Sequence, residues 1–177
     1  MFAIRKAQQR DIPEIERVMR ESIVGISNRT YDEKQVDSSL KYIAHLDREL
    51  VTDGTYFVVE NDGEVVGCGG WSRRARLYAG SGSAANDATM LDPKVDAARI
   101  RAMFVVPQFA RRGIGRMILD RCEADARAAG FRRLELMAML SGHEMYLATG
   151  YRDVEDVPAK LEDGTPYPLI RMEKTLA

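Results

Sequence analysis

The sequence has little cysteine and histidine, no excess of charge of either sign and no long apolar run. Its two cysteines cannot make a disulfide framework, and Cys68 and Cys122 fall where small buried hydrophobic residues belong. Lysine and arginine number 26 against 27 for aspartate and glutamate, so no overall field attracts nucleic acid or a membrane surface. No apolar run reaches the ~18 residues of a membrane span, and residues 1–20 lack the apolar core of a signal peptide. We therefore expect a cytoplasmic protein with no nucleic-acid or membrane partner, in which any polyanion binds at a local site.

Apolar periodicity and turn signals divide the chain into alternating strands and helices. One domain of residues 1–177 is expected, since domains commonly hold about 100 to 150 residues. Asp11 and Glu14 have the spacing of a capping box, and Asn61, Asp62 and Gly63 are typical of a hairpin turn. Predicted strands cover residues 2–7, 55–60, 64–71, 100–106, 131–140 and the C-terminal LIRMEKTL, and predicted helices cover a segment from Ile12, 32–50, 115–130 and 143–149.

Segment 104–119 (FVVPQFARRGIGRMIL) joins a buried strand to a helix through two glycines flanked by arginines. The first turn of a helix has backbone N–H groups without partners, and the helix dipole makes them positive, so a phosphate binds there favourably. Gly113 and Gly115 remove Cβ atoms that would keep a phosphate away, and guanidinium groups suit phosphate oxygens. The pattern predicts a cradle for a polyanion whose cationic side chains are Arg111, Arg112 and Arg116.

Several interpretations compete for this pattern, including a plain connection between strand and helix. A nucleotide P-loop needs lysine followed by serine or threonine after the second glycine, and neither follows Gly115. A dinucleotide fingerprint would place glycine or alanine at position 118, which is Ile118. The remaining ligand is coenzyme A (CoA), because the segment resembles the RxxGxG/A pyrophosphate loop of the GCN5-related N-acetyltransferase (GNAT) superfamily. In this chain Ala110 stands where that loop commonly has glutamine or arginine.

The order of predicted elements resembles the same family over residues 2–176. The resemblance implies an α/β (α+β) fold, the acyl-CoA N-acyltransferase fold, in which a mixed, mostly antiparallel twisted sheet is flanked by helices and splayed at the CoA-binding strand. It also implies acetyl-CoA as co-substrate, no metal, and a pantetheine arm bonded to strand backbone at Phe104 and Val105. The implied pyrophosphate contacts are Arg111, Arg112, Gly113, Ile114, Gly115 and Arg116.

Tyr146 is the predicted catalytic residue. It stands four positions before Gly150 in HEMYLATGY, which matches the Y-x-x-x-G-[FY] element of the family, with Tyr151 in the aromatic position. The resemblance implies that the Tyr146 phenol protonates or hydrogen-bonds the leaving thiolate of CoA, whereas Tyr151 packs.

The general base has no assignment from the sequence. Some relatives carry a glutamate at the position of Arg99, and many carry an asparagine at the position of Met139. The first departure leaves the base open among Asp92, Asp96, Glu144, His45 and His143, and the second removes an anchoring contact that relatives have.

No sequence motif indicates which acceptor the protein would bind. Residues 72–98 form a loop longer than most ordered connections, which is either a substrate lid or a surface insertion. Its first arginines would suit an acidic substrate, although a charge run is more often a solvated face. They are Arg73, Arg74 and Arg76.

We predict an acyltransferase that moves an acetyl group from acetyl-CoA directly to a primary amine of a small molecule or protein. The alternatives are a catalytically silent acyl-CoA sensor or partner module, and a nucleotide-binding α/β protein. Open sheet edges favour a homodimer.

Overall fold

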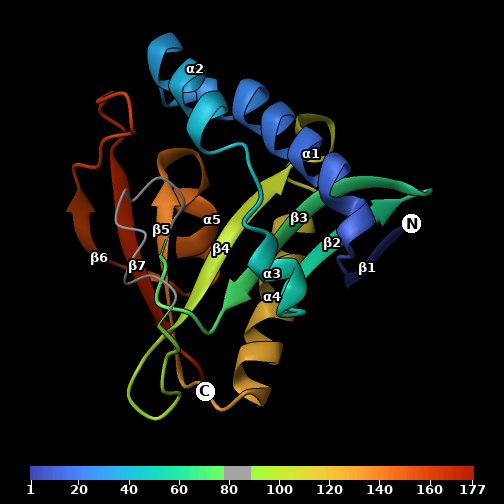
Figure 1. Cartoon of the computed structure of the whole chain (residues 1–177), viewed down its shortest axis with the longest axis vertical. Coiled ribbons are helices and arrows are strands. Elements are labelled where there is room, and N and C mark those ends of the chain that lie inside the picture. Colours follow the sequence, from blue (N-terminus) through green and yellow to red (C-terminus); the bar gives the residue numbers. More distant parts are fainter. Residues whose placement is uncertain (78–88) are drawn as a thin grey trace.

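The computed structural model describes residues 1–77 and 89–177 (Figure 1). Within these residues seven strands form one sheet in the order β1-β2-β3-β4-β5-β7-β6. The strands are β1 (Phe2–Lys6), β2 (Tyr56–Asn61), β3 (Glu64–Ser72), β4 (Ala98–Val105), β5 (Arg133–Met139), β6 (Arg152–Val157) and β7 (Leu169–Thr175). The helices are α1 (Ile12–Gly25), α2 (Glu33–Tyr42), α3 (Arg48–Thr52), α4 (Ile114–Ala128) and α5 (His143–Ala148).

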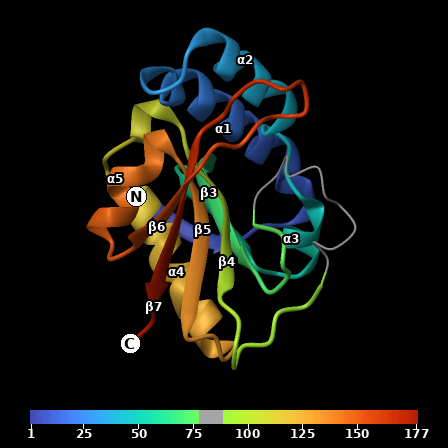
Figure 2. The ribbon, with the colours of Figure 1, turned by 90° about the vertical axis from the view of Figure 1, so that its left-hand side faces the viewer.

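The sheet is mixed and mostly antiparallel, as predicted. Only the β4–β5 pair is parallel among the described strands, and the helices lie on both sides of the sheet. Figure 2 shows α4 and α5 on one side and α3 on the other. The fold class expected from the sequence is confirmed.

The two central strands separate soon after they pair. β4 and β5 are in register only at Ala98 with Leu134 and at Arg99 with Glu135. Beyond this point they diverge, as Figure 1 shows from their lower ends upward. The β3–β4 register shifts between Cys68 and Gly70, and Ala102 opposite this shift has a φ of 52°, so a bulge bends β4 where the gap opens. The predicted splay at this strand is therefore present.

The core lies on both faces of β3 and beneath α4. Every residue of β3 after Glu64 is buried, which requires cover on both faces; in Figure 1 α1 lies in front of the sheet and α4 behind it. Cys68 and Cys122 are both buried, as predicted, and burial raises the pKa of the Cys68 thiol to about 12. Both thiols therefore act as packing groups. Among the described helices none is long and apolar enough to cross a membrane.

Two helix predictions are wrong in detail. Residues 32–50 form two helices, α2 and α3, because the Asp47 side chain accepts the Glu49 N–H at 3.1 Å and starts a new helix. Asp11 makes no capping box with Glu14: its carboxylate accepts the Gln8 N–H at 2.7 Å and two bonds from Arg5. Asp11 thus closes a capping box with Gln8 at the 3-10 turn Gln9–Asp11 and pairs with Arg5, instead of capping α1 with Glu14.

Strand β6 was not predicted. Its residues are exposed except Val157, so the strand shows no alternation of apolar and polar side chains. It forms as an outer strand because the backbone of β7 offers it a partner. The remaining predicted strands, and the helices α1, α4 and α5, are confirmed to within a few residues.

Candidate active site

The segment between β4 and α4 presents unpaired backbone N–H groups. After β4 the chain makes a 3-10 turn at Pro107–Phe109, and Arg111 then adopts a φ of 61°. Gly113 is the N-cap of α4 with a φ of 83° and no side chain that caps the helix. The first N–H groups of α4 are therefore left for a ligand or water, which is the arrangement that binds phosphate.

The two glycines of this loop have different roles. A Cβ on Gly113 would meet no atom within 4 Å, so glycine is needed there for its φ of 83°. A Cβ on Gly115 would lie 2.4 Å from Sδ of Met145, so its absence lets α5 pack against the first turn of α4. Gly115 therefore lets α5, the helix of Tyr146, approach the cradle, while the predicted approach of a phosphate to both glycines stays a prediction.

The side chains around the cradle are exposed, with one exception. Arg112 lies over the Phe109 ring at 5.2 Å, and Arg116 is 3.8 Å from the Asp120 carboxylate. Ile114 is only 1% exposed and packs inward, so it can offer a ligand its backbone N–H alone. The predicted cofactor contacts Arg111, Arg112, Gly113, Ile114, Gly115 and Arg116 thus lie together at one helix end.

The edge of β4 that faces the gap offers the backbone groups of Val105 rather than those of Phe104. The Val106 N–H donates to the Val66 carbonyl at 3.0 Å across the β3–β4 pair. Because N–H groups alternate sides along a strand, the Phe104 N–H also faces β3 and the Val105 N–H faces the gap. Of the two backbone positions predicted for pantetheine, the register favours Val105.

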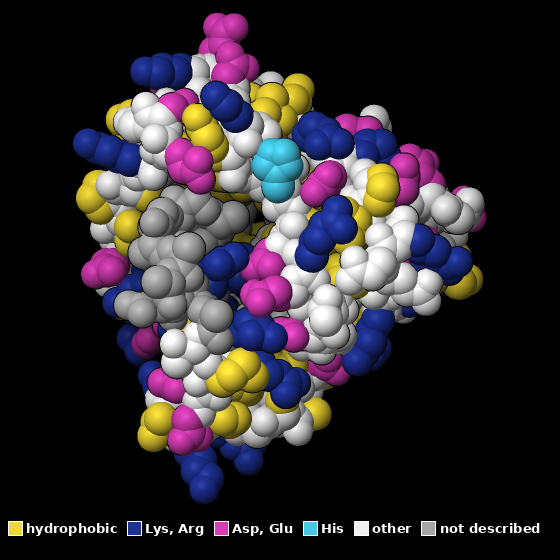
Figure 3. Space-filling model, viewed as in Figure 1, with side chains coloured by type: hydrophobic (Ala, Val, Ile, Leu, Met, Phe, Trp, Pro, Cys, Tyr) yellow, Lys and Arg dark blue, Asp and Glu magenta, His cyan; other side chains and the backbone are white. Residues whose placement is uncertain are grey.

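A cavity lies in the gap between β4 and β5. It reaches from the α2–α3 connection, on one side of the sheet, to Tyr146 of α5 on the other. Figure 3 shows a hollow at the centre of one face, with charged side chains and a histidine at its rim. The lining is mostly apolar, and its polar members are His45, Asp47, Arg101 and Tyr146.

Tyr146 is held rigidly and stays protonated. Its side chain is 7% exposed and meets Tyr151 edge to face, with ring centroids 5.7 Å apart. Burial raises the pKa of the Tyr146 phenol well above its usual value, so the phenol carries its proton at neutral pH. The hydroxyl makes no hydrogen bond with another described residue and borders the cavity. It can therefore donate to a ligand in the gap.

The structure separates the five candidate bases. His143 bonds to Asp153 at 2.7 Å, and the Asp96 carboxylate accepts the Asp92 N–H in a turn, so these residues are engaged elsewhere. Of the five candidates, which all lie in the described part of the chain, only His45 lines the cavity. Arg99, at the position of the family's glutamate, pairs with Glu135, and Met139 lines the cavity as an apolar residue.

The hydrogen bond of His45 leaves one ring nitrogen available as a base. Its Nε2 lies 3.0 Å from the Lys41 carbonyl oxygen, which can only accept a hydrogen bond. The proton of the neutral ring is thus held on Nε2, and Nδ1 keeps its lone pair. No spacing in the sequence marked His45, because it lies on an irregular connection far from the cradle in the chain.

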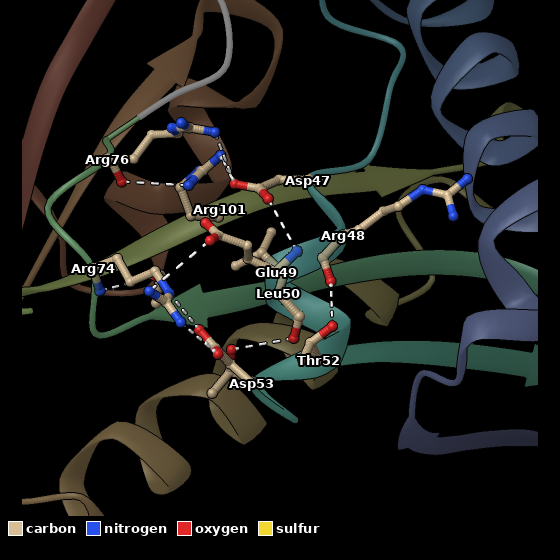
Figure 4. Close-up of polar contacts among 11 residues, drawn as sticks. Asp47, Arg48, Glu49, Leu50, Thr52, Asp53, Arg74, Arg76 and Arg101 are labelled. Atoms are coloured by element: carbon tan, nitrogen blue, oxygen red, sulfur yellow. Dashed lines mark hydrogen bonds and ion pairs between the residues drawn. The ribbon is translucent and has the colours of Figure 1, made fainter. Parts of the chain in front are cut away.

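An ion-pair cluster borders the acceptor side (Figure 4). Arg74 makes two bonds to Asp53, at 2.8 and 2.9 Å, and Arg76 donates to Asp47 at 3.2 Å. These arginines form defined pairs and are not a free charge run. The ends of the long loop pair, since Ala75 N–H donates to the Thr89 carbonyl at 2.9 Å. Residues 78–88, on which the lid and insertion hypotheses depend, lie outside the described residues.

Comparisons with known proteins point to one family. A model described as "Acetyltransferase (GNAT) family" matches residues 20–151. No curated protein matches the sequence.

Solved structures share the whole fold at low identity. A GCN5-related N-acetyltransferase from Rhodopseudomonas palustris has a TM-score of 0.75 at 20% identity, covering 98% of this chain and 95% of that one. The PaiA N-acetyltransferase of Thermoplasma acidophilum, solved with coenzyme A, has a TM-score of 0.66 at 16% identity over 99% of both chains. A Staphylococcus aureus acetyltransferase has a TM-score of 0.65 at 14% identity over 100% of both chains.

Proposed function

The chain belongs to the acetyltransferase (GNAT) family, and on that premise we propose that it transfers an acetyl group from acetyl-CoA directly to a primary amine of a small molecule or protein. One observation carries the proposal. The unpaired N–H groups that begin α4 and the side chain of Tyr146 lie on neighbouring elements: Tyr146 lines the cavity between β4 and β5, and Met145 beside it packs against Gly115 in the first turn of α4. A pyrophosphate at one point and a thioester at the other define an extended ligand such as acyl-CoA.

In the proposed binding mode, backbone groups make the main contacts to CoA and side chains add to them. The N–H groups of the first turn of α4 bind the pyrophosphate, and the exposed arginines add long-range attraction. The pantetheine amides run along the free edge of β4, where Val105 offers both an N–H and a carbonyl group. The acetyl group then enters the cavity lined by Tyr146 and His45.

The proposed reaction is one direct transfer. His45 removes a proton from the acceptor ammonium, directly or through water, since an alkyl amine has a pKa near 10.4 and is charged at neutral pH. The neutral nitrogen attacks the thioester carbon, a C–N bond forms, and the carbonyl oxygen takes the charge, stabilised by a backbone N–H of the splayed strand. The C–S bond then breaks as the Tyr146 phenol gives its proton to the CoA sulfur, and the nitrogen passes its extra proton to the Tyr146 oxygen through water, so the amide and the thiol leave with Tyr146 protonated again.

The first test is a thiol-release assay with acetyl-CoA and a panel of amines, run beside calorimetric titration of CoA, ATP and NAD. We expect thiol release with at least one amine class and binding of CoA in preference to ATP and NAD. Tight CoA binding without turnover on any amine would favour the silent sensor. Two residues support that alternative: Arg99, which is paired with Glu135, and the apolar Met139. Binding of ATP or NAD in preference to CoA would reject both.

A further inference from the structure

Arg101 is a buried cation in the wall of the cavity. It lies on β4 just before the bulge at Ala102, and its side chain is only 4% exposed. A guanidinium group removed from water costs free energy unless its N–H groups find partners. In agreement, burial lowers the pKa of Arg101.

Among the residues that the structure describes, the partners of Arg101 are few and distant. Nη1 lies 3.4 Å from the Arg76 carbonyl oxygen, and Nη2 lies 3.6 Å from Oδ2 of Asp47. A guanidinium group has five N–H donors, and charge-assisted bonds are normally about 2.7 to 2.9 Å long. Oδ2 of Asp47 also accepts a bond from Arg76 at 3.2 Å. Figure 4 shows both arginines pointing to this one carboxylate.

Arg99, two positions earlier on the same strand, shows the contrast. Its guanidinium pairs with Glu135 and donates to the carbonyls of Ala75 and Ala97, both at 3.3 Å. It is not among the residues that line the cavity, whereas Arg101 is. The two residues share a strand and a chemical type, but only Arg101 lines the cavity in which a ligand could reach its donors.

We propose that Arg101 binds a carboxylate of the acceptor, so that the acceptor is a small amine that also carries a carboxylate, such as an amino acid. This inference rests on the proposed acetyl transfer. The planar fork of a guanidinium matches the two oxygens of a carboxylate. The nearby Asp47 limits the positive potential and disfavours a doubly charged phosphate. His45 borders the same cavity, so the amine of such an acceptor has a base within the same space.

The test compares each amino acid of a panel with its amide in the thiol-release assay. Wild-type protein should prefer the acid by about 10- to 100-fold in kcat/KM, the range for losing a bond to a charged group. Arg101→Gln should abolish this preference by raising KM for the acid, with the amide and the affinity for CoA little changed. Arg99→Gln, the matched control, should keep the preference, since Arg171 still bonds Glu135 at 2.9 Å.

Two results would overturn the inference: equal kcat/KM for acids and amides in the wild type, or a preference for the acid that survives in Arg101→Gln. Thermal unfolding checks that Arg101→Gln folds. If it does not, Arg101→Lys replaces it, because lysine keeps the charge and loses the fork, and it should weaken binding of acids alone.

Calorimetry separates this inference from the proposed function. CoA-saturated protein is titrated with N-acetyl amino acids and with their amides. Binding of the acids that Arg101→Gln removes, in a protein that turns over no amine, would reject acetyl transfer and keep the carboxylate site. Turnover of amines with no difference between acids and amides would reject the carboxylate site and keep acetyl transfer.

Discussion

The proposed cofactor side and the proposed acceptor side of the gap differ in the groups that face a ligand. On the cofactor side the groups that face a ligand are backbone N–H groups at the start of α4, surrounded by exposed arginines. On the acceptor side they are the side chains of His45, Asp47 and Arg101, which come from two segments far apart in the sequence. A site made of backbone tolerates side-chain changes such as Ala110, whereas a site made of side chains depends on each one. The first side can therefore serve a whole family, and the second can distinguish acceptors.

The largest effect should come from the base on the acceptor side. His45→Ala should lower kcat/KM by about 100-fold or more at pH 7, since general base catalysis contributes roughly 10²- to 10⁴-fold. The loss should shrink toward pH 10, where the amine loses its proton unaided. Steady-state thiol release across pH measures both effects. His143→Ala is the control, and equal losses in the two variants would remove His45 from the mechanism.

A change at Tyr146 tests the proposed position of the CoA sulfur, between the two sides of the gap. Tyr146→Phe should lower kcat by about 10- to 100-fold, because it removes the proton donor to sulfur, with the Kd for CoA unchanged. Burial raises the pKa of Tyr146, so the wild-type phenol stays protonated above pH 10 and should cause no loss of rate below that pH. Tyr151→Phe removes a buried hydroxyl that has no partner and should leave kcat unchanged. An unchanged kcat in Tyr146→Phe would end the role proposed for its phenol.

Gly113 tests the backbone of the cofactor side. Gly113→Val forces a branched side chain to a φ of 83° and should destabilise the fold by about 1 to 2 kcal/mol. The same change should raise the Kd for CoA, because the first N–H groups of α4 change direction. Urea unfolding and calorimetry give the two quantities. Gly113→Asn should lower stability and CoA affinity by less, because asparagine tolerates this backbone conformation better than valine. Equal losses in the two variants would mean that the φ of residue 113 is not the cause.

The exposed arginines should give the smallest effect. Arg112→Ala and Arg116→Ala should each raise the Kd for CoA by only about 2- to 5-fold, and by less at high salt, since exposed charge pairs contribute little. Calorimetric titration at two salt concentrations measures this. A loss of about 100-fold in either variant would mean that side chains carry the cofactor side, and the comparison between the two sides would fail.

The ion-pair network explains why local signals misplaced some elements. Asp11 pairs with Arg5 and with the Gln8 backbone and makes no capping box with Glu14, and the cap formed by Asp47 divides the predicted helix of residues 32–50. β6 carries no apolar pattern because its side chains face water, and only its pairing with β7 makes it a strand. For Asp11 and for β6 the deciding partner lies outside the segment in which the signal was read, whereas the cap formed by Asp47 lies within it.

The sequence by itself determined most of the elements and the glycine N-cap of α4, and its resemblance to a known family indicated the fold class. The elements and the cap follow from local causes: apolar periodicity, the φ that glycine allows, and the N–H groups that any helix leaves unpaired at its start. Tertiary structure alone decided which backbone groups of β4 face the gap, that Met145 packs against Gly115, and that His45 and Arg101 line one cavity. The physical reason is that strand register, a bulge and burial set these contacts between residues far apart in the chain.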